Sequence, residues 1–411
     1  MLGERIRKLR KQKKMTLEAL AGDALTKGML SLIENNKAKP SMESLTYIAQ
    51  QLGVEVTDLL EEISSQELRE ILEKAEKIYN QEPEEANDQY KQLISLIEPY
   101  AGRLANGYES ARLLDIYSRS LYYEKKDGWH ELVNKAAQIY DQMNLTSRRA
   151  SLGVFRSVDK FFAHDYTESL NIHLSERRKI EATHAYIDPM TRLSLDYHEA
   201  ALYFAVGDTD SATRVMNEAL NFSKENRIFY LIDDLYRLAA GYAMMSKNIE
   251  KKAYYMKKLK QYEEFADDMN SKWFCELIHI DSLISEKHEY AKAIKWTDKI
   301  LESDEKPGSY QAYFLIEKGR ALYNLGHFSE ALHCLEQVSI PSYIHHPFDL
   351  SIFYIADSYK ALCYLEQNDL KAAIQFAEMA IKNFESLPDT SFKEFCLATY
   401  QKVKLKRQAE E

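Results

Sequence analysis

The sequence predicts an all-α protein, in which a small N-terminal helical domain precedes a long array of paired helices. The 411 residues include only 13 glycines and 8 prolines. These numbers are less than half of the usual shares, which are roughly 7% and 5%. Tight hairpins depend on these two residue types, so an all-β sandwich is excluded. A hydrophobic content of 45% excludes a disordered chain.

Charge is distributed unevenly along the chain. The formal net charge is −10, yet residues 1–40 carry ten Lys or Arg against four Asp or Glu. The first forty residues therefore have a net charge of +6, and the remainder has −16. A basic head on an acidic body indicates that the head contacts nucleic acid and that the body repels it.

Residues 1–60 are typical of five short helices, with a tight turn joining the second to the third. The first helix is basic and amphipathic. The next two begin at Thr16 and Thr26, because a threonine hydroxyl is a good N-cap. The fourth opens after Ser41 and ends at Gly53, and a last short helix follows.

The same segment contains the run IRKLRKQKKMTLEALA, followed by TKGMLSLIENNKAKPSMESLTYIAQQLGVEVTDLL. Over residues 3–60 it resembles the lambda-repressor-like DNA-binding domain of the XRE or Cro/CI type, which we expect to occupy residues 1–62. Members of that family pair an Arg on the first helix with a Glu late in the recognition helix. Those positions are Arg10 and Glu34 here. We interpret this pair as structural, because losing one partner of a buried pair is costly.

The helix that begins at Thr26 is expected to enter the DNA major groove, with its N-terminal residues at the base edges. Lysine can donate to guanine, an apolar side chain such as Leu32 can contact a thymine methyl, and the residues after the helix suit phosphates. Leu17 stands where many relatives carry a DNA-contacting Gln, so we expect a dimer on two half-sites to supply the affinity. The predicted DNA-binding residues are Thr16, Thr26, Lys27, Gly28, Ser31, Asn35, Asn36, Lys37 and Lys39.

A second pattern begins near residue 66, where one motif recurs with a mean spacing of 41 residues. Clear copies are GHFSEAL (326–332), NDLKAAI (368–374) and HEYAKAI (288–294). The sixth motif position is occupied by Ala86, Leu132, Ser169, Ala212, Lys252, Ala293, Ala331 and Ala373. A second column, seven residues before each turn, holds Ser120, Ser157, Ala200, Ala240, Asp281, Gly319 and Ala361. Small residues in both columns let two antiparallel helices approach closely.

These columns resemble the tetratricopeptide repeat, which also has small residues at both places. The period of that family is 34 residues. The larger spacing here implies longer helices or loops. The resemblance implies about eight extended repeats over residues 63–411, wound into a right-handed superhelix. Its concave face would be lined by the first helix of each pair, since each repeat packs only against its neighbours.

Counting back from each predicted turn gives candidates for the concave face. Aromatic rings, amides and arginine suit an extended peptide, because amides pair with its backbone and arginine with a carboxylate. The predicted peptide-binding residues are Tyr197, His198, Asp234, Arg237, His279, Ser282, Arg320, Tyr323 and Asn324, with Phe204, Ser285 and Glu317 on the same face.

The sequence contains no motif of an enzyme, a metal site or a cofactor site: no glycine-rich phosphate loop after a strand, no HExxH and no GxSxG. We therefore expect no catalytic residues, metal or cofactor. The four cysteines are far apart and are typical of apolar positions inside helices. No apolar run approaches the ~18 residues of a membrane helix, and the charged N-terminus differs from a signal peptide, so a cytoplasmic protein is expected.

An XRE-type head on an extended array of this length resembles the peptide-pheromone-sensing regulators of Gram-positive bacteria, the Rap/NprR/PlcR/PrgX group. NprR-like members are most similar in length and architecture. The resemblance implies a quorum-sensing transcription regulator that forms a homodimer or a higher homo-oligomer. A short, secreted and re-imported signalling peptide would bind the concave face and change the conformation or the oligomer. For NprR-like members it also implies a sporulation phosphorelay response regulator as a partner.

Three alternatives remain open at this point. The first is a Rap-like inhibitor of a phosphorelay protein with a vestigial DNA head, which Leu17 and Gly28 would permit. The second is a phage-encoded, peptide-controlled regulator of the arbitrium type. The third is a scaffold that binds no small peptide. The peptide, the operator and the sign of regulation are not encoded in any pattern that we recognise.

Overall fold

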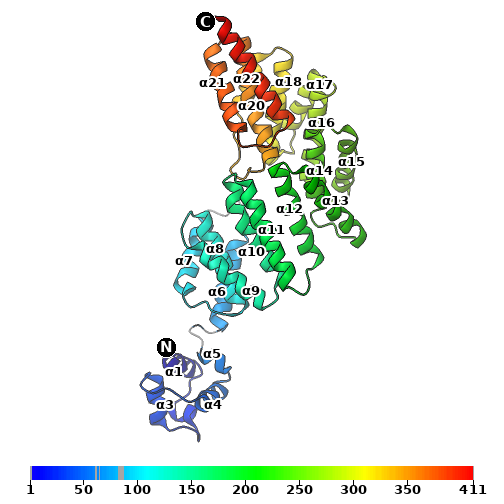
Figure 1. Cartoon of the computed structure of the whole chain (residues 1–411). Coiled ribbons are helices and arrows are strands. Elements are labelled where there is room, and N and C mark those ends of the chain that lie inside the picture. The colour runs from blue at the N-terminus through cyan, green and yellow to red at the C-terminus, as the bar shows by residue number, and fades with distance from the viewer. Residues whose placement is uncertain (1, 61–62, 64, 82–87, 411) are drawn as a thin grey trace. The chain divides into compact units, whose positions relative to one another are not determined.

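The computed structural model describes residues 2–60, 63, 65–81 and 88–410. Every regular element in this part of the chain is a helix (Figure 1), which confirms the predicted fold class. The contacts divide the chain into two compact units, residues 1–152 and 153–411. The predicted end of the first domain, residue 62, lies outside the described residues.

The first unit opens with five short helices that share a core of their own. They are α1 (Leu2–Gln12), α2 (Leu17–Ala21), α3 (Lys27–Glu34), α4 (Met42–Leu52) and α5 (Val56–Leu60). Ile6, Leu20, Leu30 and Ile48 are fully buried in this core, whose members all lie within residues 2–59. Apolar residues at helical spacing thus produce a small domain with its own hydrophobic centre.

Longer helices follow, and they pack as consecutive antiparallel pairs. The first unit continues with α6 (Ser65–Tyr79), α7 (Gln89–Ala101), α8 (Gly107–Tyr123), α9 (Trp129–Gln142) and the start of α10 (Thr146–Phe162). The second unit holds the rest of α10 and α11 (Tyr166–Thr183), α12 (Pro189–Val206), α13 (Thr209–Asn226), α14 (Ile232–Met245), α15 (Ile249–Ala266), α16 (Met269–Ser285), α17 (Tyr290–Glu302), η1 (Gly308–Tyr310), α18 (Gln311–Asn324), α19 (Phe328–Glu336), α20 (Pro347–Glu366), α21 (Leu370–Phe384) and α22 (Ser391–Glu410).

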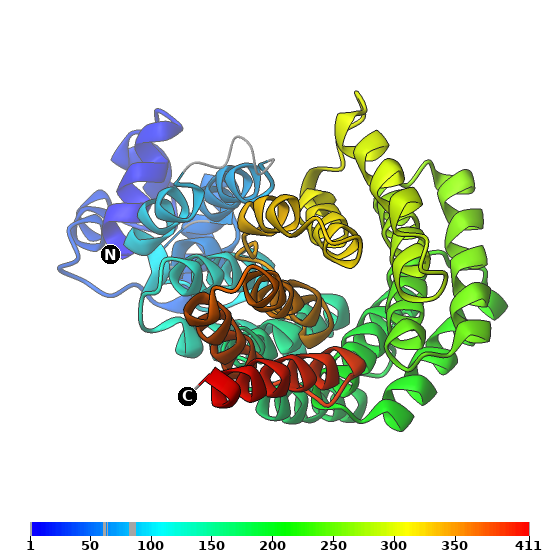
Figure 2. The ribbon, with the colours of Figure 1, turned by 90° about the horizontal axis from the view of Figure 1, so that it is seen from above.

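Within the second unit the pairs stand side by side along a curve (Figure 2). The first helices of successive pairs, such as α12, α14 and α16, contact each other and line the inner side of this superhelical array. The predicted turns between paired helices are confirmed from residue 124 onward. Ala86, in the first predicted turn motif, lies outside the described residues.

Both predicted columns of small residues are buried at helix contacts. All seven residues of the column before the turn are buried, and so are Ser169, Ala212, Ala293, Ala331 and Ala373 of the other. Lys252 breaks the rule and is still buried; its ammonium binds Ser282 at 2.9 Å and also pairs with Glu286. Leu132, the other residue of this column that is not small, is only partly buried.

The turns explain why the chain contains few glycines. In four of the described turns the left-handed backbone conformation is adopted by a residue other than glycine: His164, Lys247, His288 or Asn368. Two equivalent turns use a glycine, Gly207 or Gly326. A polar side chain then caps the next helix in several repeats, as Asp165, Asp208, Asn248 and Asp369 do. The cap compensates part of the cost of the left-handed residue.

The second unit also contains contacts between helix pairs that are not neighbours. Tyr166 donates to the carbonyl of His345 at 2.8 Å, and the ring of His346 lies 3.1 Å from the carbonyl of Ala201. Phe348 packs on Gly241, where a Cβ atom would come within 3.0 Å of the phenyl ring. The segment before α20 and the first turn of α20 therefore pack against α11, α12 and α14, which a simple nearest-neighbour array would not do.

Candidate DNA interface and ligand cavity

Helix α3 presents one polar, exposed face and one buried face. Leu30, Ile33 and Glu34 are buried, whereas Lys27 and Gly28 are exposed and Ser31 is half-buried. Leu32 is 45% exposed on the outer face. The predicted DNA-reading residues at the start of α3 are therefore accessible, as a recognition helix requires.

The orientation of α3 is held by the pair that the sequence analysis singled out. The Arg10 guanidinium lies 2.6 Å from one carboxylate oxygen of Glu34 and 2.9 Å from the other. It also donates to the carbonyl of Met15 at 2.8 Å. The side chains of Arg10 and Glu34 are only 12% and 4% exposed. The expected Arg10–Glu34 pair is therefore present, and this bidentate pair joins α1, the loop after it and the end of α3.

Two of the predicted DNA-binding residues are helix caps: Thr16, expected at a phosphate, and Thr26, expected near the base edges. The hydroxyls of Thr16 and Thr26 accept hydrogen bonds from the backbone N–H groups of Ala19 and Met29, at 3.0 and 3.1 Å. Both threonines are exposed, so each hydroxyl is still able to donate a hydrogen bond to a DNA phosphate or base. The two caps also set the tight turn, because α2 and α3 each begin at one of them.

The residues after α3 differ in their availability. Asn36 accepts a hydrogen bond from the backbone N–H of Gly3 at 2.9 Å, and Asn35 donates to the carbonyl of Ser31 at 2.8 Å. These two amides thus stabilise the domain itself. Lys37 and Lys39 are exposed side chains on the loop, so both are accessible to a DNA phosphate.

Lys27 forms an exposed ion pair with Glu18 of α2. Both side chains are more than 60% exposed, so solvent and salt weaken this pair. The hydrogen bond from Lys27 lowers the pKa of the Glu18 carboxyl. Gly28 has no atom within 4 Å of the place where a Cβ would stand, so the fold does not require a glycine there.

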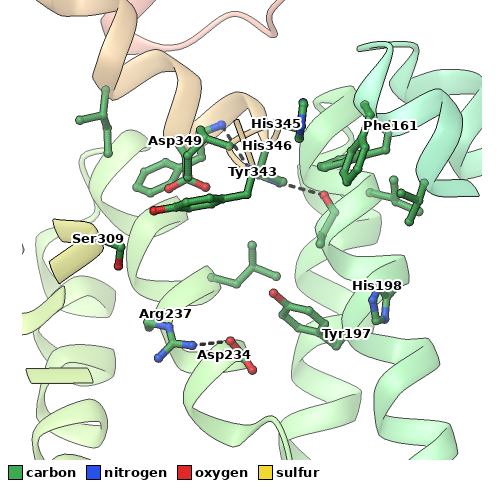
Figure 3. A pocket seen from close by; sticks show the side chains of 18 of the residues that line it. Phe161, Tyr197, His198, Asp234, Arg237, Ser309, Tyr343, His345, His346 and Asp349 are labelled. Atoms are coloured by element: carbon green, nitrogen blue, oxygen red, sulfur yellow. Dashed lines mark hydrogen bonds and ion pairs between the residues drawn. The ribbon is translucent and has the colours of Figure 1, made fainter. Parts of the chain in front are cut away.

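The second unit contains a cavity of about 650 Å³ on its inner side. Its walls come from α10, α12, α14, α16, η1, α18 and the beginning of α20, together with residues 343–346 (Figure 3). Aliphatic and aromatic side chains form most of this lining. The carboxyl and guanidinium side chains in its described lining are those of Asp234, Asp349 and Arg237. This combination of apolar walls and few polar groups is typical of a ligand site.

Four of the predicted peptide-binding residues meet in this cavity: Tyr197, His198, Asp234 and Arg237. Arg237 forms an ion pair with Asp234 and lies 3.0 Å from a carboxylate oxygen of Asp233. Burial raises the pKa of Tyr197 and lowers that of His198, whose Nδ1 lies 2.7 Å from the carbonyl of Ser194. The tyrosine hydroxyl and a neutral imidazole therefore supply uncharged polar contacts.

The other five predicted residues do not line the cavity. Arg320 is buried between α16 and α18, 2.7 Å from Glu317 and 3.0 Å from Asp281. Ser282 accepts from Lys252, and Asn324 donates to the carbonyl of Arg320 at 2.8 Å. The two aromatic members contact neighbouring rings: His279 contacts Trp296 and Tyr323 contacts Tyr359. Counting back from the turn selects residues on the first helix of a pair. It does not distinguish those that face the cavity from those that pack against other helices.

Several lining residues were not predicted, above all those of residues 343–346. The ring of His345 stacks on Phe162 with centroids 4.1 Å apart. Tyr310 and Tyr313 come from the η1 turn and the start of α18. The adjacent pair His345-His346 followed by Pro347 is a local signal for a loop, but it does not indicate where that loop packs. A second, mainly apolar cavity of about 600 Å³ shares Leu238, His346 and Phe348 with the first.

No group of three or more His, Cys, Asp or Glu side chains able to hold a metal ion lies in the described part of the chain. Nor does any helix described here have the length and apolarity needed to cross a membrane. The four cysteines are free and lie in helices; three are buried and Cys275 is half-buried.

The fold and the two sites together define a helix-turn-helix protein with a helical-repeat array that contains a ligand-sized cavity. Residues 3–64 match the family model described as a helix-turn-helix domain. No curated protein matches the sequence.

The solved structures that match this chain show low similarity to it. PlcR from Bacillus thuringiensis, in complex with the peptide PapR7 and DNA, is 17% identical, covers 64% of this chain and 97% of its own, and has a TM-score of 0.30. The SHP pheromone receptor Rgg2 from Streptococcus dysgalactiae is 15% identical over 66% of this chain and 97% of its own, with a TM-score of 0.30. Yeast Tom70 is 17% identical over 99% of this chain and 80% of its own, with a TM-score of 0.43.

Proposed function

We propose that this protein is a peptide-responsive transcription regulator. The observation that carries the proposal is that one chain combines an exposed recognition helix with a cavity on the inner side of a repeat array. A repeat array can transmit the effect of ligand binding over a long distance, because small rotations between successive repeats add up. A peptide that binds one curvature better than another shifts the equilibrium by its differential affinity.

The finer parts of the proposal follow the NprR-like resemblance. The chain acts in the cytoplasm as a homodimer or a higher homo-oligomer, and a re-imported signalling peptide changes the spacing of its DNA-binding heads. One exposed α3 reads one half-site, so two heads are needed for a full operator. A sporulation phosphorelay response regulator is a further partner in this proposal.

The test starts from the purified full-length protein and two libraries. A random 30-base-pair duplex library identifies preferred DNA, and a random heptapeptide library identifies retained peptides. Sedimentation and DNA affinity are then measured with and without a retained peptide. Retention of no peptide contradicts the proposal, as does a saturating peptide that changes neither the oligomer nor the DNA affinity. Retained peptide without any preferred DNA favours the protein-binding inhibitor.

Replacing Lys27 by Ala should weaken binding to the selected duplex about 5- to 150-fold, the range expected for one good base contact. The fold should change little, because the Lys27 side chain is 61% exposed and pairs only with exposed Glu18. Glu18→Gln should have the opposite effect, since it frees the lysine. Fluorescence anisotropy at fixed salt measures both affinities.

The control for Lys27→Ala is Lys371→Ala, which removes the same charge from an exposed position on α21. Its affinity should stay close to that of the unchanged protein. Equal affinities of Lys27→Ala and the unchanged protein for the selected duplex would show that α3 is not the reading helix.

A further inference from the structure

One wall of the 650 Å³ cavity combines a carboxylate with tyrosine rings. Asp349 is the third residue of α20, and the hydroxyl of Tyr313 donates to its Oδ1 at 3.1 Å. The capping of α20 is done by another residue, because the side chain of His346 accepts from the backbone N–H of Phe348 at 3.2 Å. The carboxylate of Asp349 is thus left to face the cavity (Figure 3).

The charges around this carboxylate do not balance. Within the described residues no lysine, arginine or histidine forms an ion pair with Asp349. Arg237, the only arginine or lysine in the described lining, already pairs with Asp234 and lies 3.0 Å from Asp233 and 3.9 Å from Asp268. One guanidinium therefore faces four carboxylates, counting Asp349.

The nearby histidines do not supply the missing positive charge. Burial lowers the pKa of His346 and of His198, so both imidazoles are neutral near pH 7. Burial also raises the pKa of Asp349, although the Tyr313 hydrogen bond and the charge of Arg237 oppose this rise, which reflects the cost of holding this carboxylate away from water. A ligand that brings a positive charge would remove that cost.

The aromatic side chains at this wall suit the same ligand charge. Tyr310 and Tyr313 have ring centroids 5.7 Å apart, and both line the cavity together with Tyr343. Tyr343 is 60% exposed, so its ring is free to cover a bound group. The faces of tyrosine rings attract cations through their quadrupole, and a carboxylate among such rings adds a direct charge–charge interaction.

We propose that the cavity selects a peptide carrying a positively charged group, which binds between Asp349 and the rings of Tyr310, Tyr313 and Tyr343. This inference rests on the proposed function and names the chemistry of its ligand. It reverses the expectation that the cavity arginine captures a peptide carboxylate, since Arg237 is already held by aspartates. An N-terminal ammonium and a Lys or Arg side chain share this chemistry.

The experiment uses two random heptapeptide libraries, one with free N-termini and one N-acetylated, each incubated with the full-length protein. Peptides retained by the protein are identified by mass spectrometry. Enrichment of Lys or Arg at one position in both libraries identifies the side chain as the cation. Retention from the free-amine library alone identifies the N-terminus.

Asp349→Asn should then weaken binding of a retained cationic peptide about 10- to 100-fold, the range of a hydrogen bond to a charged group. The Asn oxygen still accepts from Tyr313, so the fold should be kept. The neutral analogue, with norleucine for lysine, glutamine for arginine or an acetylated N-terminus, should bind both proteins equally. This double-mutant cycle isolates the charge pair.

Two further variants complete the design. Asp304→Asn removes the same charge from an exposed position outside the cavity and should leave peptide affinity unchanged. Tyr343→Leu alters an exposed ring of the cavity and should weaken cationic peptides roughly 2- to 5-fold.

The outcomes separate this inference from the proposed function. If neither library yields a retained peptide, the proposed function itself fails. If peptides bind without any preference for a cation, or if Asp349→Asn keeps the preference, the inference alone is overturned.

Discussion

Replacing Arg10 by Ala should unfold the helix-turn-helix domain and abolish DNA binding. The Arg10–Glu34 pair has side chains only 12% and 4% exposed, and it connects α1 to the end of the recognition helix. Removing one partner of a buried pair costs about 3–5 kcal/mol, because the other charge stays buried alone. A domain of about sixty residues has a total stability of roughly 3–9 kcal/mol. The loss is therefore comparable to the whole stability of this domain.

Hydrogen exchange of the full-length protein measures this effect segment by segment. Amides of α1, α3 and α4 should lose protection in Arg10→Ala, while those of α12 to α22 keep it. Arg7→Ala removes a charge from an exposed position on the same helix and should leave exchange unchanged. The double variant Arg10→Met/Glu34→Leu should recover protection, since apolar residues often replace a buried pair without loss. Unaltered exchange in Arg10→Ala would contradict the structural role.

Replacing Arg320 by Ala should destabilise the repeat array by a similar amount, about 3–5 kcal/mol. This guanidinium lies 2.7 Å from Glu317 and 3.0 Å from Asp281, and all three side chains are at most 10% exposed. Without it, two carboxyl groups remain buried at the contact of α16 and α18. Burial already raises the pKa of Glu317 to about 7, and Arg320 is the group that opposes this rise.

The destabilisation by Arg320→Ala should increase with pH. An acid whose pKa is raised in the folded state stabilises the fold fully at a pH below the pKa that it has in the unfolded chain. That contribution is lost as the pH rises through the pKa that it has in the folded protein. The ordinary pKa of a glutamate is 4.5, and the pKa of folded Glu317 should rise further in the variant because the opposing charge of Arg320 is gone. Urea unfolding at pH 5 and pH 8 checks this, and an equal loss at both pH values would contradict it.

A matched control and a compensated variant separate structure from ligand binding. Lys318→Ala removes a partly exposed pair with Asp298 from the same helix and should cost much less. The triple variant Arg320→Met/Glu317→Gln/Asp281→Asn removes all three charges and should regain stability. This variant should still bind peptides retained by the unchanged protein. Loss of peptide binding in a stable triple variant would show that Arg320 contacts the ligand.

Most of the fold could be predicted because its rules are local. The caps at Thr16, Thr26 and Ser41 begin helices where expected, and the small-residue columns lie at helix contacts. Two departures from those columns, Lys252 and Asp281, are charged residues whose partners come from the adjacent repeat or helix pair. Their burial depends on those partners and not on their own type.

The cavity was predicted only in part, for a physical reason. The periodicity of a helix identifies which residues share a face. In an array, however, the residues that contact the two neighbouring helices and those that face the inner side lie within one turn of each other. Tyr197 and Arg237 lie on the inner side, whereas Arg320, from the equivalent helix of another repeat, lies in a helix contact. Residues 343–346 reach α10 and α12 from far along the chain, and no local pattern carries such a contact.

The sequence by itself therefore determined an all-α chain with a basic helix-turn-helix head and an acidic array of paired helices. It did so because caps, helical periodicity and repeat spacing act between residues close in the chain. Only the tertiary structure decided which polar groups face the cavity, where a segment before α20 crosses the array, and that Asp349 forms no ion pair with the basic side chains of the described residues. Those features depend on distances between residues up to 179 positions apart, which are set only when the helices pack.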